Sequence, residues 1–337
     1  MAPPSATPLP LLLLLLLAPH RSHGCDRTHG GEDSGCGLPV APPGGPEVRN
    51  VGGEDAAPGA WPWTGALLRR GGHVCGASLV APEWVLTAAH CFQESRDPRL
   101  YSVLLGSQWL PPRAGPSQGL VVPVAEVLPH PRYRGEATSG DVALARLARA
   151  VPLGPRVLPV CLPPPGPAFP PPGARCVATG WGEARDGAAP RRLQELEVPV
   201  LALSTCRRLY GIDMGRALPP RAIHADMVCA GYAEGQRDTC KGDSGGPLSC
   251  RAGGGRWALA GVVSWGQGCG VPNRPGVYTR VSAYVTWIRP RAPGAAFLGH
   301  APLGPAGTNG SARSAGGAAG VIAVGLLVAA LKGQWGR

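Results

Sequence analysis

Glycine and proline interrupt this chain so often that short strands are favoured over long helices. The sequence contains 51 glycines and 40 prolines among 337 residues, and both residue types break helices. Short apolar runs such as 102–105 and 259–264 lie between turn residues, a pattern that suits strands better than helices. A composition of this kind can also indicate disorder, but nine tryptophans and repeated valine, leucine and alanine runs indicate a packed interior. We therefore expect an all-β fold.

Both ends of the chain look like targeting segments. Residues 9–18 are nearly continuous leucine, too few to span a bilayer, and small residues follow at 22–24. This pattern predicts a signal peptide over residues 1–24 and secretion. After removal of the ends about 240 residues remain, enough for one two-lobed unit. The proline-rich segment 162–173 cannot be a central strand, so we expect it to cross between the lobes.

The C-terminal part predicts attachment to the cell surface. Residues 291–317 are rich in proline, glycine and alanine and are expected to form a flexible stalk. Residues 318–337 contain an apolar run that fits a GPI-attachment signal. The alternative is a short single-pass helix with basic residues on the cytoplasmic side. Asn309 begins an Asn-x-Ser sequon and is a candidate glycosylation site.

The cysteine count indicates an oxidising compartment. Eleven cysteines occur without any Cys-x-x-Cys pair, so a zinc site is weakly supported and disulfides are favoured. Spacing alone does not decide how the cysteines pair.

The net charge of +11 does not by itself indicate nucleic-acid binding. No basic stripe interleaved with aromatic residues occurs, and lysine is almost absent. We expect no nucleic-acid partner, whereas weak attraction to acidic polymers of the cell surface stays open.

The run 238–247, Asp-Thr-Cys-Lys-Gly-Asp-Ser-Gly-Gly-Pro, can supply the parts of an acyl-transfer site. Ser244 among glycines can expose its hydroxyl on a tight turn, and the N–H groups of Gly242 and Ser244 can converge on a developing oxyanion. A serine nucleophile also needs a base and a supporting carboxylate. His90, beside a cysteine, and Asp141, at the start of an apolar run, are the candidates.

These three residues occur in the order histidine, aspartate, serine and lie within further motifs. The motifs are Trp61-Pro62-Trp63, Trp84 through Cys91, Thr179-Gly180-Trp181-Gly182, Ser264-Trp265-Gly266 and Arg274 through Tyr278. Over residues 36–288 the chain resembles the trypsin-like serine proteases of the chymotrypsin family, most closely the membrane-anchored tryptase and prostasin branch. The resemblance implies two six-stranded antiparallel β-barrels, an active site in the cleft between them and a short C-terminal helix.

The resemblance also implies what each site residue does. His90 is the general base, Asp141 supports it and Ser244 is the nucleophile. Asp238 lies at the base of the primary pocket, where its carboxylate favours substrates with arginine or lysine. Ser264, Gly266 and Gly276 complete the substrate-binding positions, the two glycines as pocket walls. Protein substrates are expected, with no cofactor and no metal.

Five disulfides are implied by the family pattern. They are Cys36–Cys161, Cys75–Cys91, Cys176–Cys250, Cys206–Cys229 and Cys240–Cys269. Cys25 is left over. Calcium-binding relatives use acidic side chains in a loop that corresponds to residues 106–124, which here contain neither aspartate nor glutamate.

Activation is expected by cleavage after Arg49. Residues 25–49 would then be a propeptide, and residues 50–290 the peptidase domain, whose new ammonium on Asn50 pairs with Asp243. The resemblance further implies an activating trypsin-like protease and serine protease inhibitors as partners. Asn50 stands where relatives have an apolar residue, and burying its amide costs ~1–3 kcal/mol unless it finds partners. The alternative function is therefore a protease homologue with weak or no activity that acts by binding.

Overall fold

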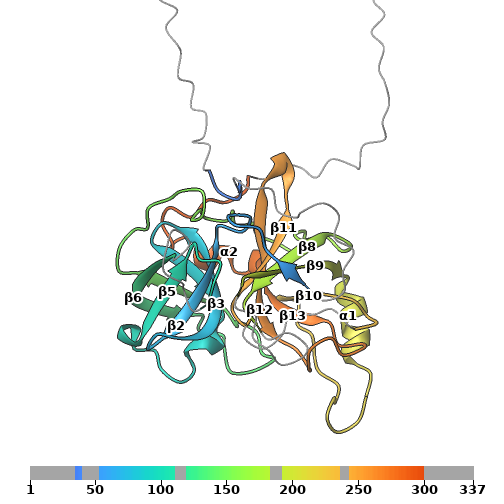
Figure 1. Cartoon of the computed structure of the whole chain (residues 1–337). Helices are drawn as coiled ribbons and strands as arrows, with labels where there is room; N and C mark the ends of the chain where they lie inside the picture. The colour runs from blue at the N-terminus through green and yellow to red at the C-terminus, as the bar shows by residue number, and fades with distance from the viewer. Residues whose placement is uncertain (1–34, 40–52, 111–118, 183–191, 236–242, 300–337) are drawn as a thin grey trace, which may run out of the picture. The chain divides into compact units, whose positions relative to one another are not determined.

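The computed structural model describes residues 35–39, 53–110, 119–182, 192–235 and 243–299 (Figure 1). Residues 1–299 group into one unit by their contacts, and residues 300–337 form a second unit that lies outside the described residues. The expected signal peptide, the C-terminal hydrophobic segment and Asn309 also lie outside them. Within the described residues, no helix has the length and apolar character needed to cross a membrane.

Six antiparallel strands close into a first barrel in the order β2-β3-β4-β7-β6-β5. The strands are β2 (Thr64–Arg69), β3 (Gly72–Ala81), β4 (Trp84–Thr87), β5 (Tyr101–Leu105), β6 (Leu120–Pro129) and β7 (Ala143–Leu147). The apolar run 102–105 lies in β5, as the sequence predicted. In the first half of β6, Val122 and Val124 are buried while their neighbours are not, the alternation of a strand with one face in the core.

A second barrel follows in the chain. Its sheet has the order β1-β9-β10-β13-β12-β11-β8, and a further pairing of β8 with β9 closes six of these strands. The strands are β1 (Glu54–Asp55), β8 (Arg175–Gly180), β9 (Gln194–Leu201), β10 (Met227–Ala230), β11 (Pro247–Arg251), β12 (Trp257–Trp265) and β13 (Gly276–Arg280). All nine residues of β12 are buried, which explains its continuous apolar sequence. The expected fold of two six-stranded antiparallel barrels is confirmed.

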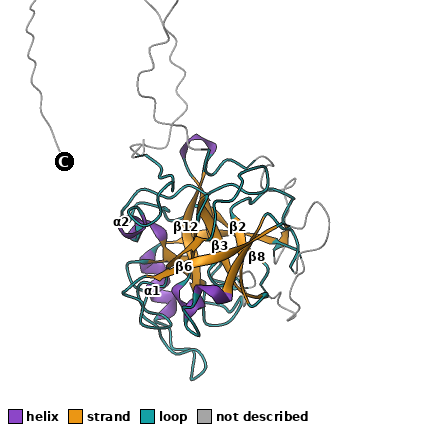
Figure 2. Cartoon of the chain, turned by 90° about the vertical axis from the view of Figure 1, so that its left-hand side faces the viewer, coloured by secondary structure: helices purple, strands orange, loops and turns teal. Residues whose placement is uncertain are grey.

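Helices are few and lie around the strands (Figure 2). They are η1 (Ala89–Phe92), η2 (Pro98–Leu100), α1 (Leu203–Tyr210), η3 (Gly253–Gly255), η4 (Val281–Ala283) and α2 (Val285–Ile288). The short C-terminal helix α2 packs against the first barrel, since Tyr284 and Ile288 belong to the same buried cluster as that barrel's strands. Beyond α2, two backbone hydrogen bonds hold the chain to Leu162. Leu162 N–H donates to Ala296 O at 2.8 Å, and Leu298 N–H donates to Leu162 O at 2.9 Å. The expected stalk therefore starts with residues that contact the barrels.

Two features join the barrels. The proline-rich segment 162–173 connects β7 of the first barrel to β8 of the second, and contains no strand. Trp63 is fully buried and donates its indole N–H to Ser249 Oγ of β11 at 3.0 Å. Burying an indole while satisfying its N–H makes it an effective packing group, so Trp63 fixes the first barrel against the second.

Four of the five expected disulfides are present. They are Cys36–Cys161, Cys75–Cys91, Cys176–Cys250 and Cys206–Cys229. Cys269 is disulfide-bonded as well, while Cys240, its expected partner, lies outside the described residues. The short segment 35–39 is thereby tied to the barrels through Cys36.

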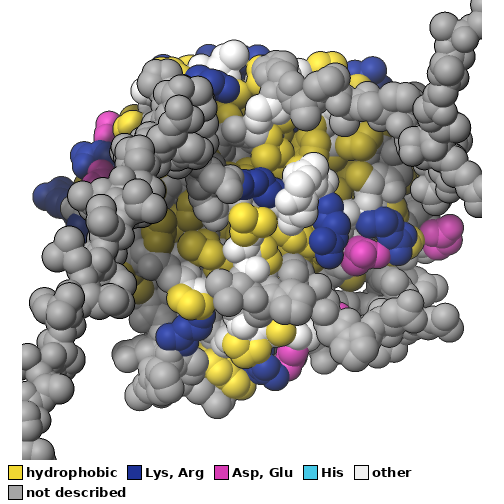
Figure 3. All heavy atoms as spheres, turned by 90° about the horizontal axis from the view of Figure 1, so that it is seen from above, with side chains coloured by type: hydrophobic (Ala, Val, Ile, Leu, Met, Phe, Trp, Pro, Cys, Tyr) yellow, Lys and Arg dark blue, Asp and Glu magenta, His cyan; other side chains and the backbone are white. Residues whose placement is uncertain are grey.

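Basic side chains are spread over the surface. Only two of the 32 basic residues are lysines, Lys241 and Lys332, and both lie outside the described residues, so every basic side chain coloured in Figure 3 is an arginine. On the face drawn there, these arginines stand at several separate places beside hydrophobic side chains.

Candidate active site

His90 is held by the turn that follows β4. It lies in η1, directly beside Cys91, whose disulfide fastens this turn to Cys75 of β3. The hydroxyl of Thr87 at the end of β4 donates to Gly76 O at 2.7 Å. The backbone that carries the imidazole is therefore fixed on both sides of the histidine.

Asp141 lies two residues before β7 and is 5% exposed. Its carboxylate accepts three hydrogen bonds, from His90 N–H at 2.9 Å, from His90 Nδ1 at 2.8 Å and from the hydroxyl of Ser264 at 2.5 Å. The hydroxyl of Thr279 in β13 donates to the backbone oxygen of Asp141 at 2.6 Å. Ser264 and Thr279 belong to the second barrel, so both barrels position this carboxylate.

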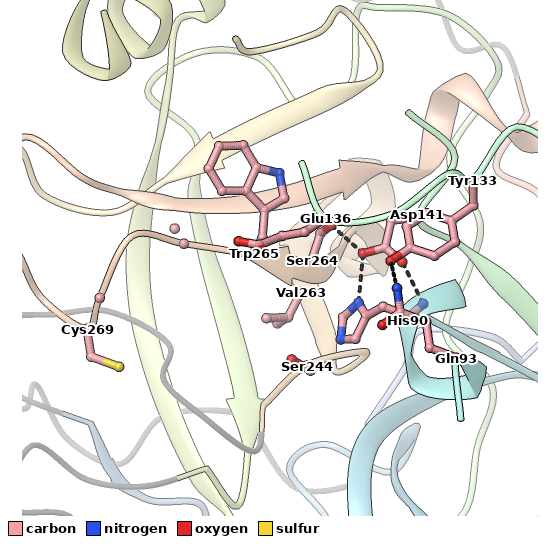
Figure 4. Close-up of a pocket in the computed structure, with 13 residues that line it drawn as sticks. His90, Gln93, Tyr133, Glu136, Asp141, Ser244, Val263, Ser264, Trp265 and Cys269 are labelled. Carbon is pink, nitrogen blue, oxygen red and sulfur yellow. Dashed lines mark hydrogen bonds and ion pairs between the residues drawn. The ribbon is translucent and has the colours of Figure 1, made fainter. Parts of the chain in front are cut away.

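The contact with Asp141 also sets the tautomer of His90. An ionised carboxylate only accepts hydrogen bonds, so neutral His90 carries its proton on Nδ1 and keeps a lone pair on Nε2. Figure 4 shows Asp141 on one side of the imidazole and Ser244 on the other. The arrangement can move a proton between the serine hydroxyl and the histidine.

Ser244 is positioned by close backbone packing before β11. Its carbonyl accepts from Gly76 N–H at 2.7 Å. Gly245 has a φ of +80°, and a Cβ there would lie 2.2 Å from Thr87 Oγ1 and 2.6 Å from Gly76 O. Only glycine fits this conformation and this spacing, which explains why the serine is followed by glycine.

Asp243 lies against the loop after β8. Its Oδ1 accepts from Gly182 N–H at 2.8 Å. A Cβ on Gly180 or Gly182 would come within 2.0 and 2.5 Å of the Asp243 side chain, so the two glycines make room for the carboxylate. The expected partner of Asp243, the ammonium of Asn50, lies outside the described residues.

A cleft with a volume of about 380 Å³ joins these residues. It brings together six sequence-predicted site residues, namely His90, Asp141, Ser244, Ser264, Gly266 and Gly276. The hydroxyl of Ser264, expected only as a substrate-binding position, points to Asp141. The remaining candidates, Asp238, Gly242, Arg49 and Asn50, lie outside the described residues.

Three polar residues of the cleft were not singled out in the sequence. Gln93, Tyr133 and Glu136 also line it, and the amide of Gln93 donates to the hydroxyl of Tyr133 at 2.7 Å. Burial, with smaller effects of the negative charges of Asp141 and Glu136, raises the pKa of Tyr133, so its hydroxyl stays protonated. Glu136 is exposed, and its position five residues before Asp141 is the one signal that could have placed it here.

Arg274 lies behind Trp265, one of the residues that line the cleft, and stabilises that wall through Tyr210. It is 1% exposed, and its guanidinium donates to the side chain of Gln267 and to several backbone carbonyls, among them Leu209 O and Ile212 O, both at 2.7 Å. Its guanidinium carbon lies 5.3 Å from the ring centre of Tyr210, which in turn packs against Trp265 of the cleft. A buried cation with satisfied donors ties the α1 region to the cleft wall, a role that the sequence motif alone did not reveal.

The group formed by Cys75, His90 and Cys91 has the spacing of metal ligands. The two cysteines are bonded to each other, so no thiolate is available from them. This cluster, within the part of the chain that the structure describes, does not fit a metal ion.

Comparison with known proteins identifies the family of the chain. The profile of the Trypsin family matches residues 50–288. Over 255 residues the chain is 48% identical to Transmembrane protease serine 9 of Rattus norvegicus. The matched region covers 75% of this chain and 22% of that protein, so the chain spans about a fifth of its relative's length. The chain belongs to the trypsin family of serine proteases.

Proposed function

We propose that this chain is a serine endopeptidase that cleaves protein substrates after arginine or lysine. The observation that best supports catalysis is the cleft shared by Asp141, His90 and Ser244, with His90 Nδ1 2.8 Å from Asp141 Oδ2. The hydrogen bonds to Asp141 leave Nε2 of His90 available as a base. Membership of a protease family supports a protein as the substrate.

Each residue has a role in the proposed reaction. Ser244 Oγ attacks the carbonyl carbon of the scissile bond while His90 Nε2 takes the hydroxyl proton. His90 returns this proton to the leaving amine, and water repeats the sequence to release the acyl group. Asp141 stabilises the imidazolium, and the N–H groups of Gly242 and Ser244 hold the oxyanion.

The preference for arginine or lysine rests on Asp238. A carboxylate at the base of the pocket is costly to desolvate unless a substrate cation pairs with it. Gly266 and Gly276 line the same cleft as Ser244, and their lack of side chains leaves room for a long cationic group.

Activation is proposed to follow cleavage after Arg49. In this scheme residues 25–49 are the propeptide, residues 50–290 the peptidase domain, and a trypsin-like protease performs the cut. The freed ammonium of Asn50 pairs with Asp243 and orders the oxyanion loop. Serine protease inhibitors are the expected regulators of the active form.

We further propose that the catalytic domain is held at the cell surface. A signal peptide over residues 1–24 directs secretion, residues 291–317 form a stalk, and residues 318–337 attach the protein as a GPI signal or a single-pass helix. The name of the rat relative, a transmembrane protease, supports a membrane-attached form.

Covalent labelling of Ser244 tests the proposal. A fluorophosphonate probe should label the trypsin-treated protein and not the untreated one, because only the ordered site activates the hydroxyl. Ser244→Ala should lose both labelling and hydrolysis of an arginine amide, whereas Ser204→Ala, at an exposed serine of α1, should keep both. If the probe labels the wild type but the protein cleaves only after residues other than arginine and lysine, the chain is still a serine protease. The assignment of Asp238 to the base of the substrate pocket would then be refuted.

The second candidate function is a binding protein with the shape of a protease. The polar Asn50 at the new N-terminus favours it, since burial of the amide opposes ordering of the site. Absence of labelling and of hydrolysis after complete cleavage at Arg49 would support this function and contradict catalysis.

A further inference from the structure

The loop between α1 and β10 contains the most exposed segment of the described chain. Residues 211–217 are all exposed, and no other run of consecutive exposed residues is as long among those that the structure describes. Ile212 is 40% and Met214 37% exposed, so neither side chain is buried in a core. In Figure 1 this loop, drawn in yellow, extends away from the strands. Exposed loop tips are preferred sites of proteolytic cleavage. We call residues 211–221 the α1 loop.

The bond between Arg216 and Ala217 lies at the centre of a turn in the α1 loop. Leu218 N–H donates to Gly215 O at 3.0 Å, and Met214 N–H donates to Leu218 O at 3.3 Å. Both hydrogen bonds that close the turn lie within the loop, and water can replace them when the turn opens. The turn can therefore open into an extended segment without breaking a hydrogen bond between strands.

The other arginines of this region are less accessible along their backbone. Arg208 is exposed but lies in α1, where helical hydrogen bonds hold its backbone. Arg221 is exposed, but its N–H donates to Tyr210 O at 2.9 Å. Neither Arg216 nor Ala217 donates its backbone N–H to another described residue. The bond after Arg216 is thus the one best suited to enter the cleft of a protease.

Arg274 joins the two sides of this bond. Its Nη2 donates to Ile212 O at 2.7 Å, before the bond, and to Leu218 O at 3.1 Å, after it. Arg274 is 1% exposed, and hydrogen bonds from a buried cation are stronger than those between neutral groups. The intact loop therefore keeps both carbonyls on one guanidinium nitrogen.

Gln267 connects the same loop to the wall of the cleft. Its Nε2 donates to Pro219 O at 3.0 Å, and its Oε1 accepts from Arg274 Nε at 2.6 Å. Gln267 lies within residues 265–269, and the other four residues of this segment line the cleft. A cut after Arg216 would leave Pro219 near a free chain end, so its contact with Gln267 would no longer be supported by a closed loop.

We propose that the bond between Arg216 and Ala217 is a regulatory cleavage site, cut by a second copy of this chain. The inference rests on the proposed protease function and its preference for arginine. A second copy is required because hydrogen bonds from Arg274 and Gln267 fasten the loop to the wall of its own cleft. Cleavage loosens this wall and lowers activity, so the enzyme limits itself as its concentration rises.

The cleavage follows the proposed reaction. Ser244 Oγ of the second copy attacks the carbonyl carbon of Arg216, and the amine of Ala217 leaves with the proton from His90. One water then hydrolyses the acyl group and leaves a carboxylate on Arg216. The disulfide Cys206–Cys229 spans the site, so the two parts stay joined until the disulfide is reduced.

Incubation of full-length Ser244→Ala protein with a small amount of active wild type tests the site. Electrophoresis with reductant should show a new fragment that begins with Ala217, formed at a rate proportional to the wild-type concentration. Adding Arg216→Gln to the Ser244→Ala protein should abolish this fragment. The matched control is Arg221→Gln, which removes the other exposed arginine of the α1 loop and should leave the fragment in place.

Activity over time tests the regulation. Concentrated active wild type should lose about tenfold in kcat/KM on an arginine amide as the cut proceeds, the effect of losing roughly one charge-assisted hydrogen bond. Arg216→Gln should start with the same kcat/KM and keep it. The fraction cut after Arg216 is measured in the same samples by electrophoresis with reductant.

Several outcomes would overturn the proposal. A fragment that forms only after Arg221, or an equal loss of activity in Arg216→Gln, would exclude Arg216 as the site. Complete cutting after Arg216 with unchanged kcat/KM would refute the regulatory effect. Hydrolysis of the arginine amide without any cut after Arg216 would overturn this inference alone, whereas absence of both would overturn the proposed protease function as well.

Discussion

Removal of the Ser264 hydroxyl measures how strongly this residue of the second barrel stabilises the charge on Asp141. Ser264 is 8% exposed and donates to Asp141 Oδ2 at 2.5 Å. The same oxygen accepts from His90 Nδ1 at 2.8 Å. Ser264→Ala therefore deletes one of three donors to a nearly buried carboxylate and leaves the other two in place.

The size of the effect follows from the charge of the acceptor. A hydrogen bond to a charged group contributes ~1.5–3 kcal/mol to the free energy of unfolding, and one between neutral groups ~0.5–1.5 kcal/mol. For a domain of this size each kcal/mol changes Tm by ~2–4 °C. We expect Ser264→Ala to cost about 2 kcal/mol and to lower Tm by roughly 4–8 °C. Water from the adjoining cleft can offset part of this loss.

Thr279→Val provides the matched control. It deletes a hydroxyl that donates to the neutral backbone oxygen of the same residue, Asp141, at 2.6 Å. Both changes are compared by thermal melting in a Ser244→Ala background, which prevents self-digestion. In the active background, Ser264→Ala should lower kcat more than it changes KM, because Asp141 supports the imidazolium that forms only during the reaction. A Tm loss no larger than that of Thr279→Val, together with an unchanged kcat, would refute the reasoning.

Four further changes test other parts of the site. Asp238→Ser should cut kcat/KM on arginine substrates by roughly 10²–10³, because the substrate cation loses its buried partner; unchanged kinetics would place the specificity elsewhere. Asn50→Ile should raise kcat/KM of the cleaved form, and equal values would mean that the Asn50 amide finds partners. EDTA should leave Tm unchanged, because residues 106–124 offer no carboxylate to calcium; a clear drop would reveal a site. Glu136→Gln should reduce any preference for a second basic residue in peptide substrates about fivefold, since Glu136 lines the cleft; an unchanged ratio of dibasic to monobasic kcat/KM would exclude this role.

The barrels and most of the cleft could be anticipated from local sequence. Runs such as 102–105 and 259–264 have the length and flanking residues of strands, and they lie in β5 and β12. The motif residues His90, Asp141 and Ser244 are recognisable because each stands in a short, characteristic context. The family pattern, rather than spacing, supplied the four disulfides whose cysteines are both among the described residues.

Long-range contacts between side chains could not be anticipated in the same way. Ser264 reaches Asp141 across 123 positions of the sequence, and Arg274 reaches the backbone carbonyls of Leu209 and Ile212 across 65 and 62 positions. Whether a hydroxyl or guanidinium finds a partner depends on how the loops pack, which hydrophobic periodicity does not encode. For the same reason Gln93 and Glu136 resemble ordinary surface residues in the sequence, although the structure places both in the lining of the cleft.

The disulfide between Cys36 and Cys161 has a consequence for how activation can be observed. Cys36 is 3% exposed, and its neighbour Gly37 accepts from Trp257 N–H at 2.9 Å and donates to Pro159 O at 2.9 Å. After a cut at Arg49, the segment that contains Cys36 would remain joined to the barrels as a light chain. Electrophoresis without reductant would show one unchanged band, whereas reductant would release the light chain. A tag placed ahead of Cys36 would therefore follow the cleaved two-chain protein as well as its precursor.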